Sequence, residues 1–89
     1  MNQEDKEKTM YTNADKFINL ANELAKSDKS GGIGVALRYA AARYSAFEAS
    51  MRTDNLADDK EKQLQVFTND FSNMLQINIE NYIEIKSRN

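Results

Sequence analysis

Residues 33–53 read IGVALRYAAARYSAFEASMRT and predict a helix that other parts of the protein cover on most sides. A seam with heptad spacing runs along this stretch through Ile33, Leu37, Ala40, Tyr44, Phe47 and Met51. A second, alanine-rich face lies nearly opposite when successive residues are placed about 100° apart, and it contains Val35, Tyr39, Ala42, Ala46 and Ala49. A helix with two apolar faces is expected to pack against two neighbouring elements.

The chain on either side of this stretch supplies two further helical patterns. Residues 13–27 carry apolar side chains on one face, and Thr12 or Asn13 can cap their first turn. Residues 56–86 follow a break at Asp54 and Asn55, either of which can cap the helix. The glycine cluster at residues 30–34 lacks the spacing of a phosphate-binding loop and favours a turn between helices with positive φ.

The resulting prediction is an all-α fold, a three-helix antiparallel bundle with helices at 13–27, 33–53 and 56–86. Residues 1–10 are expected to form a disordered, charged leader, because acids and lysines alternate there with nothing to bury. Residues 11–89 are expected to form a single helical domain, since a chain of 89 residues has room for one small core.

Composition excludes several classes of function. The chain has no Cys, His or Pro, so it offers no disulfide, no thiolate zinc site and no histidine general base. We therefore expect no catalytic residues, no metal and no cofactor. With 12 basic against 14 acidic residues and a pI near 5.1, nucleic acid is not an expected partner. No apolar run approaches the roughly 20 residues of a membrane span, so no membrane association and a cytoplasmic location are expected.

Arg43 is the charged residue in the least expected place. On the helical wheel it falls between the two apolar faces of residues 33–53, where an unpaired charge is costly. One interpretation is a structural clasp with Asp15 or Asp70, whose loss in Arg43→Ala would cost roughly 3–5 kcal/mol. The other is an anchor for a small anionic ligand, with a polar cluster made of Asn19, Asn22, Tyr39 and Asn78.

The last helix is expected to be too long for its neighbour. About 30 residues span ~45 Å, whereas the middle helix of about 20 residues spans only ~30 Å. The overhanging end carries the candidate oligomer interface, which consists of Ile77, Ile79, Tyr82, Ile83 and Ile85. Apolar residues around a projecting helix suggest a partner chain, most simply a second copy. The alternative is that the helix bends back and buries them within its own chain.

Two blocks of sequence resemble a known family. FINLAN at residues 17–22 and YAAARYSAF at residues 39–47 are similar to the small bacterial proteins grouped as domain of unknown function 3144. Met74, Leu75, Asn78 and Tyr82 resemble the C-terminal pattern of that family, although Ser45 stands where the family more often has Asn. The resemblance implies a bacterial, cytoplasmic protein and brings no activity or site residue with it.

The sequence as a whole favours a non-catalytic protein–protein interaction module that acts as a homodimer, with an unidentified protein as a further partner. The alternative function is the binding of a small anionic ligand around Arg43.

Overall fold

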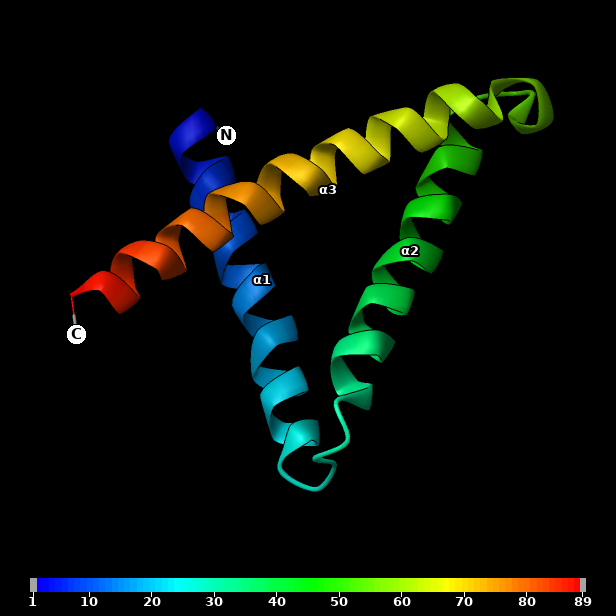
Figure 1. Cartoon of the computed structure of the whole chain (residues 1–89). Coiled ribbons are helices and arrows are strands. Elements are labelled where there is room, and N and C mark those ends of the chain that lie inside the picture. Colours follow the sequence, from blue (N-terminus) through cyan, green and yellow to red (C-terminus); the bar gives the residue numbers. More distant parts are fainter. Residues whose placement is uncertain (1, 89) are drawn as a thin grey trace. The chain divides into compact units, whose positions relative to one another are not determined.

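A computed structural model describes residues 2–88 of the chain (Figure 1). It contains α1 at Gln3–Ala25, α2 at Gly32–Arg52 and α3 at Leu56–Ser87, and residues 2–88 include no β-strand. The predicted all-α fold with three helices, of which the last is the longest, is confirmed. The bounds of α2 and α3 lie within one residue of the predicted ones.

The predicted start of the first helix is wrong by ten residues. The side chain of Asn2 caps α1 by accepting a hydrogen bond of 2.8 Å from the backbone N–H of Asp5. Residues 3–10, predicted to be a disordered leader, are helical because this earlier cap is followed by good helix formers with no break. Thr12, a predicted cap, instead donates its hydroxyl to the carbonyl of Lys8 within the helix.

The glycine cluster forms the predicted turn. Gly31 has a φ of +90°, a left-handed conformation that glycine adopts without a Cβ penalty. Ser30 stabilises the start of α2, since its hydroxyl oxygen accepts a hydrogen bond of 3.1 Å from the backbone N–H of Gly32.

The start of α3 is held by a polar network that the sequence partly predicted. Asn55 caps the helix, because its side-chain oxygen accepts a hydrogen bond of 3.2 Å from the backbone N–H of Asp58. Its side-chain nitrogen donates a second hydrogen bond, of 2.7 Å, to the carboxylate of Asp58. The hydroxyl of Thr53 donates to the carboxylate of Asp59. The connection between α2 and α3 is therefore fixed by local hydrogen bonds.

The chain divides into two compact units, unit 1 up to Arg43 and unit 2 from Tyr44. Unit 1 contains α1 and the first part of α2, and unit 2 contains the rest of α2 and α3. In each unit the two helical segments diverge at an angle from the connection that joins them (Figure 1).

The interior of unit 2 is small. Ala49 and Gln63 are the only buried residues in the part of the chain that the structure describes. Gln63 lies between Asp59 and Phe67 at a spacing of four, so the three share one side of α3. The guanidinium carbon of Arg52 lies 5.6 Å from the centre of the Phe67 ring, which identifies this side of α3 as the one nearest the end of α2.

Most of the two apolar faces predicted for α2 is not covered within the units, although Ala49 is buried and Ile33 is half-buried. Tyr39, Tyr44 and Phe47 are all exposed, and a side chain that is exposed in the whole chain is also exposed in its own unit. The physical reason is that each unit contains only two helical segments, so each part of α2 has one neighbour there where two were predicted.

Candidate functional site

Arg43, its predicted polar cluster and the two predicted clasp partners together are seven residues, and they fall into both units. Asp15, Asn19, Asn22, Tyr39 and Arg43 belong to unit 1, and Asp70 and Asn78 belong to unit 2. All seven are exposed. Their assembly into one anion site stays a prediction, because it would need residues of both units.

The sequence predicted that Arg43 would be shielded from water, but its side chain is accessible to solvent. Its side chain is exposed, and it forms no ion pair with Asp15 among the described residues of unit 1. An exposed guanidinium is hydrated and needs no buried partner. The clasp with Asp15 is therefore absent, and the clasp with Asp70 stays a prediction.

Asn78 bonds to its own helix. Its side-chain amide nitrogen donates to the carbonyl oxygen of Met74 at 2.8 Å, one turn earlier in α3. This bond uses one of the two N–H groups of the amide and leaves its oxygen available as an acceptor.

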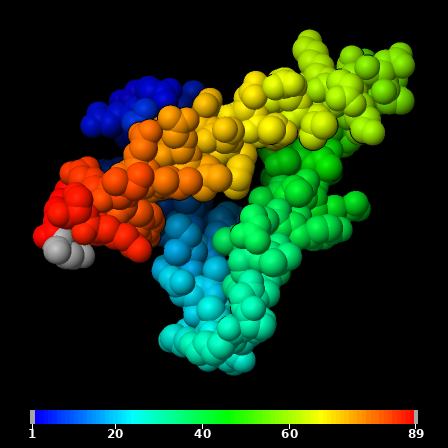
Figure 2. Space-filling model, in the orientation of Figure 1, coloured from blue at the N-terminus to red at the C-terminus, as the bar shows by residue number. Residues whose placement is uncertain are grey.

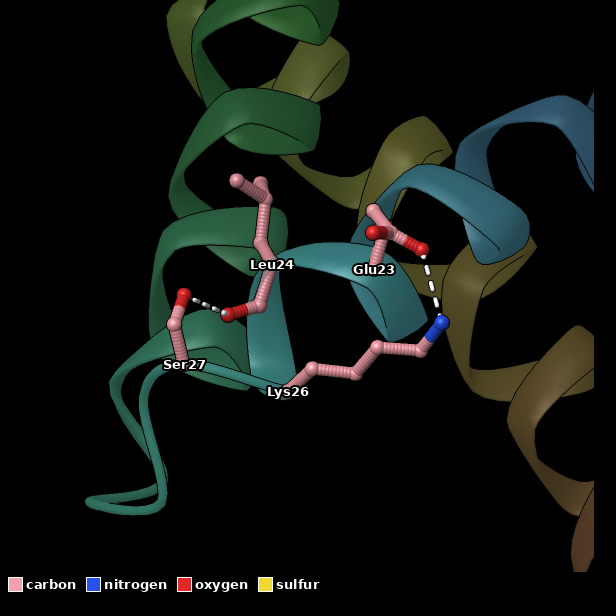
Figure 3. A network of polar contacts seen from close by, with 4 residues as sticks. All are labelled: Glu23, Leu24, Lys26 and Ser27. Atoms are coloured by element: carbon pink, nitrogen blue, oxygen red, sulfur yellow. Dashed lines mark hydrogen bonds and ion pairs between the residues drawn. The ribbon is translucent and has the colours of Figure 1, made fainter.

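Polar contacts also lie at the C-terminal end of α1. Figure 3 shows the ion pair between Lys26 and Glu23, whose nitrogen and oxygen atoms are 3.0 Å apart, and the hydrogen bond of 3.3 Å from the Ser27 hydroxyl to the carbonyl of Leu24. Both groups of the ion pair are exposed, so the pair contributes at most about 1 kcal/mol to stability. These contacts are explained by helix termination and do not indicate a ligand.

Hydrogen bonds within the turn between α1 and α2 alter the proton affinity of Asp28. The Ser30 hydroxyl, and to a smaller extent the Ser30 backbone N–H, donate hydrogen bonds that lower the pKa of Asp28 from its ordinary value of 3.8. A carboxyl group with a lowered pKa stays ionised near neutral pH, so it is a poor general acid there. Asp28 is best understood as a turn residue.

The apolar surface at the end of α3 is the strongest candidate site. We call residues 71–85 the distal segment. The predicted interface residues all lie in it and are exposed: Ile77 66%, Ile79 50%, Tyr82 63%, Ile83 62% and Ile85 40%. This segment is part of the single helix α3 in unit 2, and its atoms are coloured orange to red in Figure 2.

The apolar surface is larger than the sequence analysis proposed. Phe71, Met74 and Leu75, which are not among the predicted interface residues, are exposed at 48%, 49% and 46%. On a helical wheel of about 100° per residue they lie on the same side as Tyr82 and Ile85. Their periodicity alone does not show whether a helix of the same chain or a partner covers them.

Two other familiar features, a metal-binding cluster and a membrane-spanning helix, are not found among the described residues. Within residues 2–88, no group of three or more acidic side chains is arranged to hold a metal ion. No described helix is both long and apolar enough to cross a bilayer.

Comparison with known proteins identifies a family for this chain, but it finds no relative whose activity is known. No curated protein and no solved structure matches the chain. The model of one family, described as a protein of unknown function (DUF3144), matches residues 10–83. This match covers most of the chain, and the protein therefore belongs to the DUF3144 family.

Proposed function

We propose that this protein is a non-catalytic, cytoplasmic interaction module that acts as a homo-oligomer, most simply a homodimer joined through the distal segment of α3. The observation that carries the proposal is the exposed apolar surface of that segment. A contiguous apolar surface of this kind is typical of a binding interface, whereas single exposed apolar residues are not.

Helix length supports a partner from outside the hairpin of α2 and α3. The 21 residues of α2 span about 32 Å, and the 32 residues of α3 span about 48 Å. Because only three residues connect the two helices, an antiparallel α2 can cover α3 only as far as about Ile77. The last turns of α3, which carry Tyr82, Ile83 and Ile85, extend beyond that reach.

The distribution of apolar residues around the distal segment gives a second argument. Ile77 lies on the side of the helix opposite Leu75 and Ile79, at about 100° per residue. A helix that is apolar on more than one side is usually covered by more than one neighbour. A second chain would supply the neighbour that the α2–α3 hairpin lacks.

The test is the molar mass of the protein in solution. We expect light scattering coupled to gel filtration to give twice the chain mass at high concentration. The double variant Tyr82→Lys/Ile85→Lys removes two apolar contacts per chain, each worth roughly 1.5–3 kcal/mol, and should weaken association by at least about a hundredfold.

A matched control adds the same charge to the polar side of the same helix. Asn73→Lys/Gln76→Lys should leave the molar mass unchanged, because both residues are exposed and lie on the side of α3 opposite Tyr82 and Ile85. A strictly monomeric protein at high concentration, with far-UV circular dichroism showing intact helices, would overturn the proposal.

A further inference from the structure

We infer that the distal segment pairs antiparallel with the distal segment of a second copy, about a two-fold axis that passes beside Asn78. This inference rests on the proposed function and adds the direction and register of the helix pair. In such a pair each residue faces the residue that lies equally far from Asn78 on its other side.

The spacing of the apolar residues is symmetric about Asn78. Met74 and Tyr82 lie four residues to either side of it, and Phe71 and Ile85 lie seven residues to either side. All four share one side of α3 with Asn78, with the three-and-four spacing that lets helices interdigitate. An antiparallel pair would therefore place Phe71 of one chain against Ile85 of the other, and Met74 against Tyr82.

The side chain of Asn78 has the groups that a symmetric contact needs. One of its two amide N–H groups already donates to the carbonyl of Met74. The second N–H and the side-chain oxygen are left to exchange hydrogen bonds with the partner's Asn78. A single asparagine in an apolar helix seam fixes register, because shifting the pair would leave its amide unsatisfied.

The charges near the distal segment favour the antiparallel direction. Asp70 lies eight residues before Asn78 and Lys86 eight residues after it, so the pair brings opposite charges to the same level along the helix axis, on the two flanks of the apolar seam. In the same antiparallel pair, Glu80 lies level with the uncharged Gln76 of the other copy, and Glu84 lies level with its Ser72. A parallel pair in register would instead bring each charged residue level with its own copy, which is repulsive.

Cysteine cross-linking tests the direction directly, because the chain has no cysteine of its own. Asn78→Cys should form a disulfide-linked dimer under mild oxidation, since the two-fold axis brings its copies within the 4.4–6.8 Å between Cα atoms that a disulfide needs. Ile85→Cys alone should not, because its two copies would lie about 21 Å apart along the helices. An equimolar mixture of the Phe71→Cys and Ile85→Cys variants should form a disulfide-linked dimer with one chain of each variant, because the pair places residue 71 of one chain against residue 85 of the other.

The outcomes separate this inference from the proposed function. A dimer in which Ile85→Cys links to itself, or in which the mixture gives no mixed disulfide, overturns the antiparallel register and leaves the interaction module standing. A monomeric unmodified chain overturns both. Circular dichroism on each variant checks that the helices persist.

A charge exchange provides a test that needs no oxidation. Asp70→Lys should weaken dimerisation a few fold at low salt, because it replaces two long-range attractions across the seam by two repulsions. Adding Lys86→Glu to Asp70→Lys should restore the original affinity, measured by sedimentation equilibrium at low salt. Failure of this rescue in a protein that still dimerises would overturn the proposed register.

Discussion

Gly31 shows how a single residue sets the path of the chain between α1 and α2. Its φ of +90° is one that residues with a Cβ rarely adopt, and no atom lies within 4 Å of where a Cβ would be. Backbone conformation alone therefore decides what a substitution does there. We expect Gly31→Ala to lower the free energy of unfolding by roughly 1–2 kcal/mol, as measured by urea denaturation at fixed protein concentration.

Gly34 is the matched control for that measurement. It lies in the first turn of α2 with helical geometry, and an added Cβ would meet Arg38 at an ordinary contact distance of 3.5 Å. Gly34→Ala should raise stability by up to about 1 kcal/mol, because alanine has the higher helix propensity. Equal effects of the two substitutions would contradict the assignment of the turn to Gly31.

At the scale of the helices, the start of α3 depends on Asn55. Replacing Asn55 by Ala removes both its bonds to Asp58 and should destabilise the protein by about 1 kcal/mol, with a range of roughly 0.5–2 kcal/mol. Thermal unfolding followed by circular dichroism measures this loss. Asn73→Ala, in the exposed middle of the same helix, should be neutral or slightly stabilising, and a comparable loss there would show that the cap is not the cause.

The helices are the part of this protein that its sequence predicts well. Alternating three- and four-residue spacings located α2 and α3, and Asn55 was among the two caps proposed for α3. The start of α1 was missed, because Asn2 and Asn13 are both acceptable caps and the residues between them are compatible with a helix or with a solvated leader.

For the whole molecule, stability should depend on concentration. Every large apolar side chain of the described residues other than Ile33 and Phe67 is exposed, so neither unit has a core of large apolar side chains. If a second copy covers the distal segment, folding and association are linked. A tenfold rise in protein concentration should then raise the melting temperature by about 3–5 °C.

Calorimetry over a hundredfold concentration range measures this shift. The Tyr82→Lys/Ile85→Lys variant is the control, because a chain that no longer associates should melt at the same temperature at every concentration. A concentration-independent melting temperature of the unmodified protein would contradict linkage between folding and association.

The sequence by itself determined the number of helices, a glycine turn within residues 30–34 and a cap of α3 at Asp54 or Asn55, because these features depend on residues within a few positions of one another. Only the tertiary structure decided that Gln63 and Ala49 are the buried residues, that Arg52 lies over Phe67 and that Arg43 is exposed. Burial depends on the direction in which each helix leaves its turn and on which neighbour it then meets. An apolar periodicity shows that a face must be covered, but it does not distinguish a helix of the same chain from a helix of a partner.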